Sequence, residues 1–159
     1  MFNCNKYKVI ACVNLGVVLL ITGCNDTKQA QCQRLINLVN EGTSLIEKDK
    51  GSQVTLSLRL ADDLKDVSKK IENQNFQDPK LKDFKNQYAK HFDAKSKNIE
   101  SAGKALGSAK TAEKNSSAGR QQVRQAKTDI ETSLKLVKDV AQESDTLANQ
   151  LNEYCTQTE

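Results

Sequence analysis

Residues 118–157 read AGRQQVRQAKTDIETSLKLVKDVAQESDTLANQLNEYCTQ, and this stretch decides the fold class. Its apolar residues recur at steps of three and four, the spacing of one face of an α-helix, and no Pro interrupts them. A helix of this length spans about 55–60 Å at 1.5 Å per residue. The positions that carry the pattern are Val123, Ala126, Ile130, Leu134, Val137, Val140, Ala141, Leu147, Leu151 and Tyr154.

Three earlier segments show the same helical spacing. Asp78 and Pro79 predict a sharp start for the third, as N-cap and first helical residue. Residues 54–60 alternate like a strand, but we expect a helix there because no second strand candidate exists to pair with them. The predicted helices are 28–49, 52–75, 79–112 and 118–157. They indicate an all-α fold, an antiparallel four-helix bundle that forms a single domain over 28–157.

Composition agrees with a helical domain. The chain has 159 residues, of which only 4% are aromatic, and these figures suit one domain and argue against a β-sandwich or barrel. The alternative to four helices is three long ones, in which the first two segments fuse through Gly51. The small-residue stretch 101–119 is either a close-packed helix contact or a mobile region.

The N-terminal residues 1–23 differ from the rest of the chain. Lys6 and Lys8 precede an apolar run of about 13 residues, which is short for a membrane-spanning helix. The segment ends in Ile21-Thr22-Gly23-Cys24. It resembles the signal segment of bacterial lipoproteins, in which a branched apolar residue, a small residue and Gly or Ala precede the lipidated Cys. The alternatives are an ordinary secretory leader and an uncleaved anchor helix.

The resemblance implies a specific maturation. Signal peptidase II would cut between Gly23 and Cys24, the Cys24 thiol would carry diacylglycerol, and its new amine would carry an acyl chain. Residues 24–27 would then be a short lipidated tether that holds the bundle at the extracytoplasmic face of the cell membrane. Asn25 follows the Cys and leaves inner and outer membrane equally open. The mature part resembles small helical lipoproteins of cyanobacteria, a likeness that implies no activity.

Cysteine use predicts one disulfide. Cys4 and Cys12 leave with the leader and Cys24 takes the lipid, so Cys32 and Cys155 remain in an oxidising compartment. An up-down-up-down bundle brings these two residues to the same end, whereas three long helices would separate them. Two buried free thiols are the alternative.

Charge is uneven along the chain. Losing Lys6 and Lys8 lowers the formal net charge from +4 to +2, and 79–114 holds nine Lys against four acidic residues. This segment could present a basic face to anionic headgroups or an acidic partner, or simply a solvated helix surface. So small a net charge makes nucleic acid a poor partner. The candidate face is Lys82, Lys85, Lys90 and Lys97.

The remaining chemistry is sparse. His91 has no Cys or carboxylate at zinc-motif spacing, so we predict no metal site and expect this residue at the core boundary beside Phe92. Phe84, Tyr88 and Phe92 form a stripe that is more often core than ligand pocket. No phosphate loop, nucleophile elbow or acid–base constellation is recognisable.

These observations predict a lipid-anchored, non-enzymatic helical module that binds a protein partner or stabilises an envelope assembly, without a cofactor other than its covalent lipid. The alternative is a carrier or chaperone-like bundle that holds a small apolar ligand against the aromatic stripe. Sequence leaves the partner and the oligomeric state open.

Overall fold

The computed structural model describes residues 26–48 and 53–157. Within them the chain forms four helices and no strand, which confirms the all-α four-helix prediction over three long helices. They are α1 (Lys28–Lys48), α2 (Val54–Glu72), α3 (Pro79–Thr111) and α4 (Ser117–Thr156). The predicted leader, the cleavage site at Gly23 and Cys24, and the predicted helix end at Gly51 lie outside the described residues.

Side-chain caps fix where helices begin. The Asp78 carboxylate accepts a hydrogen bond from the backbone N–H of Leu81 at 2.9 Å, and Pro79 occupies the first turn of α3, as predicted. The Ser116 hydroxyl accepts from the N–H of Gly119 at 2.9 Å and starts α4. These caps satisfy backbone donors that have no partner inside the helix. The strand-like alternation at 54–60 lies in the first turns of α2.

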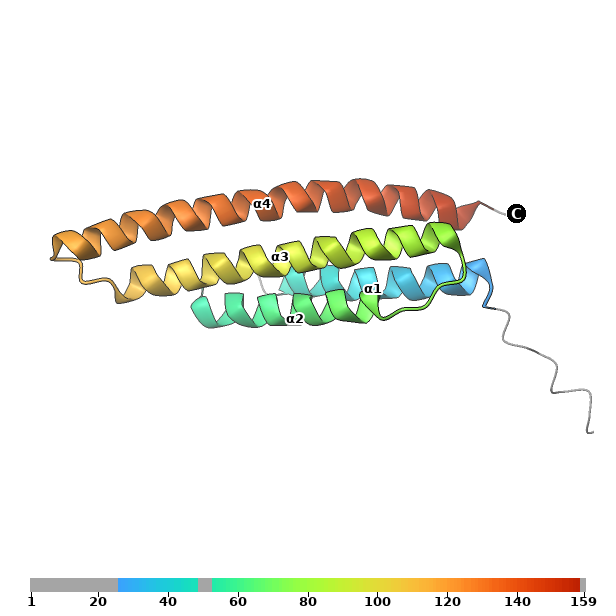
Figure 1. The fold of residues 1–159 in the computed structure, drawn as a ribbon, viewed down its shortest axis with the longest axis horizontal. Coiled ribbons are helices and arrows are strands. Elements are labelled where there is room, and N and C mark those ends of the chain that lie inside the picture. The colour runs from blue at the N-terminus through green and yellow to red at the C-terminus, as the bar shows by residue number, and fades with distance from the viewer. Residues whose placement is uncertain (1–25, 49–52, 158–159) are drawn as a thin grey trace, which may run out of the picture.

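The helices differ in length, and α3 is central. α2 and α4 pack extensively against α3 and do not contact each other, while α1 packs mainly on α2. α3 and α4 run past the ends of α1 and α2 (Figure 1). We call the end that carries Cys32, Cys155 and the loop 73–78 the disulfide end, and the end at residues 112–116 the turn end.

The predicted disulfide is present. Cys32 on α1 and Cys155 near the end of α4 are joined, with their Cα atoms 5.9 Å apart and 123 positions of sequence between them. The start of α1 and the end of α4 lie at the same end of the molecule (Figure 1). This is the arrangement that an antiparallel four-helix bundle requires, so the pairing and the helix count agree.

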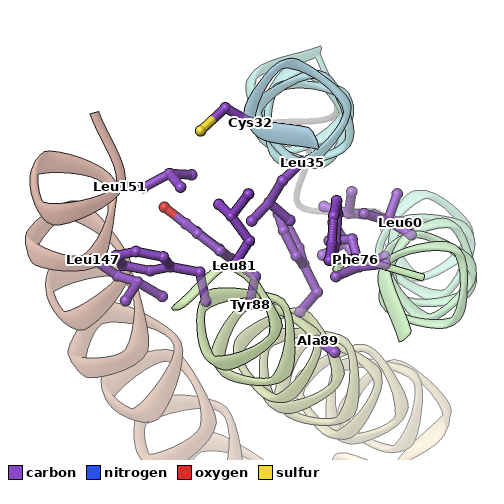
Figure 2. Packing of buried hydrophobic residues seen from close by; sticks show 14 residues of the cluster. Cys32, Leu35, Leu60, Phe76, Leu81, Tyr88, Ala89, Leu147 and Leu151 are labelled. Carbon is purple, nitrogen blue, oxygen red and sulfur yellow. The ribbon is translucent and has the colours of Figure 1, made fainter. Parts of the chain in front are cut away.

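The main apolar core lies toward the disulfide end. All four helices and the loop residue Phe76 contribute to it, and Figure 2 shows side chains from α1, α2, α3 and α4 converging. No residue of α4 before Leu147 belongs to this cluster. Its buried members are Cys32, Leu35, Leu60, Leu64, Val67, Ile71, Phe76, Leu81, Phe84, Tyr88, Ala89, Phe92, Leu147 and Leu151.

Glycines allow two close helix contacts. A Cβ atom on Gly42 of α1 would lie 2.3 Å from a ring carbon of Phe92, so only Gly lets α1 approach α3 here. A Cβ on Gly103 would lie 3.1 Å from the Cβ of Ser57 on α2. The small-residue stretch 101–119 is expected to be either a close-packed helix contact or a mobile region. At Gly103 it is a close-packed contact.

Candidate functional site

The outer face of α4 carries the most exposed large apolar side chains of the described residues. Leu134 is 53% exposed, Leu136 45% and Val123 36%, and Ile130 and Val137 are partly exposed. Helical spacing places Val123, Ile130, Leu134 and Val137 on one side of α4. We call these four residues the outer stripe.

Among the described residues, the outer stripe is uncovered because α4 packs only against α3 in this region. Ala126 and Ser133 are the small buried residues on the α3 side of α4, and Gln122 donates to the backbone and side-chain oxygens of Ser108 at 3.0 Å. α1 has ended at Lys48, and α2 does not reach α4. The apolar residues of α4 therefore fall into two groups. One group faces α3, and the other group is exposed.

Side-chain contacts tie the first described residues to the disulfide end. Arg34 holds Asp26 through two hydrogen bonds of 2.5 and 2.8 Å, and this hydrogen-bonded cation keeps the pKa of the Asp26 carboxyl below its usual value. The buried Gln31 side chain donates to the carbonyl of Asp26 at 2.5 Å and accepts from the N–H of Gln77 at 2.6 Å. Cys24 precedes Asp26 by two positions in the sequence.

The four lysines of the predicted basic face lie on α3 but differ in their contacts. Lys85 donates to the carbonyls of Glu72 and Gln74 at 3.2 and 3.4 Å, and so completes the C-terminal end of α2. Lys97 pairs with Asp93 at 2.7 Å. Lys82 and Lys90 are exposed. Two of the four ammonium groups are therefore engaged within the chain.

A surface groove of about 480 Å³ lies between α2 and α3 beside these lysines. It is lined by both signs of charge together with Ser68, Asn86 and Ala89: the charged residues are Lys65, Lys69, Glu72, Lys90 and Asp93. Lys69 is paired with Asp66 at 3.1 Å. Such mixed charge does not single out an anionic ligand.

A polar junction between α3 and α4 was not predicted from the sequence. The Lys95 ammonium donates to the Ser144 hydroxyl at 2.9 Å, and Nδ1 of His91 lies 3.1 Å from the same oxygen. Nε2 of His91 lies 3.7 Å from a carboxylate oxygen of Glu143. His91 is half-buried at the core boundary, as expected, but it has polar partners on α4. These residues lie about 50 positions apart in sequence, so spacing gave no signal.

Burial controls the ionisation of this junction. Lys95 is only 7% exposed, and desolvation lowers its pKa although the negative charge of Asp145 partly offsets the effect. Desolvation also lowers the pKa of His91, against the opposing effect of Glu143 and with the help of Lys95. His91 is therefore neutral at pH 7.

The Ser144 hydroxyl is at the centre of the junction. The Ser144 hydroxyl lies 2.8 Å from the carbonyl of Val140 and donates its hydrogen there, while its oxygen accepts from Lys95. The junction therefore links α3 to α4 through side-chain hydrogen bonds. No group of three His, Cys, Asp or Glu in residues 26–48 and 53–157 could hold a metal ion.

The aromatic stripe is core. Phe84, Tyr88 and Phe92 are all buried, and the Tyr88 hydroxyl has no hydrogen-bond partner within the described residues. Burial, together with the negative charge of Asp145, raises the pKa of Tyr88 to about 12. The Tyr88 oxygen points into the space between α1 and α4 (Figure 2). The stripe thus lines the packed interior.

Comparisons with protein-family models, curated proteins and solved structures found no match. In the part of the chain covered by 26–48 and 53–157, no helix is long and apolar enough to cross a membrane.

Proposed function

We propose that this chain is a bacterial lipoprotein, anchored through Cys24 to the extracytoplasmic face of a cell membrane, whose helical bundle is a non-enzymatic protein-interaction module. The sequence supports the anchor, because a basic start, an apolar run and Ile21-Thr22-Gly23-Cys24 occur in order. The lipid is diacylglycerol with an N-acyl chain, and we propose no other cofactor.

The outer stripe is the observation that carries the interaction role. Monomeric soluble proteins rarely leave contiguous apolar patches larger than a few hundred Å² uncovered, and larger patches mark binding sites. Leu134 and Val123 are exposed on α4. This helix is held in place by the Ser116 cap and by the hydrogen bond from Gln122 to Ser108 on α3. The stripe also lies away from the disulfide end, where the tether starts, so an anchored molecule leaves it accessible.

The carrier alternative has less support. It requires the aromatic stripe to face a cavity, but Phe84, Tyr88 and Phe92 pack into the core. The pocket beside Phe84 measures about 270 Å³, and its other lining residues are mainly polar or charged: Lys80, Gln150, Glu153, Tyr154 and Gln157. An apolar ligand would gain little from this surface.

Photo-crosslinking in the native membrane tests the interaction role. A photoreactive side chain at Leu134 should form a protein adduct, whereas the same side chain at Lys82 should not. The absence of an adduct at Leu134 and at Ile130 would contradict the proposal.

Membrane fractionation tests the anchor separately. Cys24→Ala should shift the protein from the membrane fraction to the soluble fraction, and Cys12→Ala, within the predicted leader, should leave it in the membrane. Retention of Cys24→Ala in the membrane would contradict lipidation at this residue.

A further inference from the structure

The outer stripe has the spacing of a coiled-coil seam. Val123, Ile130 and Val137 follow at intervals of seven, and Leu134 lies between the last two at the alternate position. Apolar residues that repeat in this way form a narrow seam against one partner helix. The alternate position between Val123 and Ile130 is the exposed Lys127, so the unbroken apolar seam runs from Ile130 to Ala141 and spans about 17 Å at 1.5 Å per residue.

Charged residues flank the seam on one side only. Arg124, Glu131, Lys138 and Asp145 also follow at intervals of seven, and their signs alternate. Arg124, Lys138 and Asp145 form no ion pair within the described residues, and Glu131 has only a 3.8 Å contact with the exposed Lys127. On the opposite flank, Ala126 and Ser133 are buried against α3. The charged flank is therefore the one that α3 does not cover.

The alternating signs are self-complementary in one orientation. When a second α4 runs antiparallel along the seam, equivalent flanks face each other. When Leu134 packs beside Val137 of the other copy, Glu131 lies near Lys138 of the other copy. Arg124 then lies near Asp145 of the other copy. Two-fold symmetry repeats each pair. A parallel partner would need the flank that α3 already covers, so it could not use these charges.

We infer that the occupant of the outer stripe is a second copy of this chain, paired antiparallel through α4 with the symmetry axis between Leu134 and Val137. This inference rests on the proposed interaction role but not on the lipid anchor. Since α4 ends near the start of α1, the starts of the two α1 helices lie at opposite ends of the dimer. A pair anchored in one bilayer then lies along its surface.

Sedimentation equilibrium on the purified full chain tests the dimer, with two neighbouring leucines as a matched pair. Leu134→Lys should weaken dimerisation at least tenfold, because it buries a charge in the seam. Leu136→Lys changes a leucine of similar exposure on another side of α4, and should leave the dimer unchanged. Circular dichroism checks that both variants keep their helices.

Charge reversal tests the orientation. Glu131→Lys should weaken the dimer, and Glu131→Lys combined with Lys138→Glu should restore it, since the exchanged charges again face each other only in an antiparallel pair. A monomeric wild type at all accessible concentrations, equal effects of the two leucine variants, or no restoration by the double exchange would overturn the inference. An adduct at Leu134 with a different protein would overturn it as well, and would leave the proposed interaction role standing.

Discussion

The two halves of α4 carry similar apolar periodicity but meet different surroundings. Toward the disulfide end, Leu147 and Leu151 are 2–3% exposed, inside a core that all four helices build. Toward the turn end, Leu134 is 53% exposed and α4 touches α3 alone. The same pattern therefore yields a core in one half and an open face in the other.

Helix length is the physical reason for the difference. α1 and α2 have 21 and 19 residues, whereas α3 and α4 have 33 and 40. The short pair can cover only part of the long pair, and hydrophobic periodicity records which side of a helix is apolar without recording what covers it. The molecule thus combines a cross-linked base with a two-helix extension.

Loss of the disulfide should have the largest effect on the base. Replacing Cys32 and Cys155 by Ser opens a loop with a sequence separation of 123. In the chain-entropy description this lowers the free energy of unfolding by about 4–5 kcal/mol. Urea denaturation measures the loss, and hydrogen exchange should show α1 opening before the far part of α4. Unchanged stability, or opening of the turn end first, would contradict the division into halves.

Substitutions at two glycines compare a tight helix contact with a looser one. Gly42→Ala should destabilise the protein by about 1–3 kcal/mol, because the new Cβ would collide with the Phe92 ring. Gly107→Ala meets Val54 at an ordinary 3.6 Å and should be neutral or stabilising, since Ala favours a helix. Thermal unfolding of both variants checks the contrast, and equal effects would refute it.

Removing either of two tyrosine hydroxyls near the disulfide end should change the free energy of unfolding, in opposite directions for the two residues. Tyr154 donates to the Asp78 carboxylate at 2.6 Å, so Tyr154→Phe should lower the free energy of unfolding by about 1–3 kcal/mol. Tyr88→Phe removes a buried hydroxyl without a partner and should raise it by about 1 kcal/mol. Denaturant midpoints distinguish the two, and a destabilised Tyr88→Phe would show that its hydroxyl has a partner.

The polar junction should give the smallest effect, a dependence of stability on pH. Because burial lowers the pKa of His91 from its ordinary value of 6.5, the unfolded chain binds the proton more readily. Stability is therefore complete above pH 6.5 and declines as pH falls toward the lowered value. His91→Gln should flatten this decline between pH 7 and 5.5, because the chain has no other His. An unchanged slope would place the titration elsewhere.

Local sequence signals predicted much of the fold. Asp78-Pro79 marks a helix start by its cap chemistry, and the lack of a second strand candidate assigned 54–60 to a helix. Cys32 and Cys155 lie near opposite ends of the predicted helical domain, so their pairing and the four-helix arrangement depend on each other.

The candidate sites were less predictable, because they depend on contacts between distant segments. Lys95 looks like one more surface lysine until α4 brings Ser144 against it. Leu134 and Leu147 both belong to the apolar pattern of α4, but Leu147 lies on the side that packs into the core and Leu134 on the open side. Gly42 is unremarkable in sequence until Phe92 packs on it.

Intact mass of the protein from its native membrane, with and without reduction before thiol alkylation, tests the proposed anchored base most directly. The account predicts a chain that begins at Cys24 and carries diacylglycerol and an N-acyl group, with two thiols that alkylate only after reduction. A chain without lipid, or two thiols that alkylate before reduction, would contradict it.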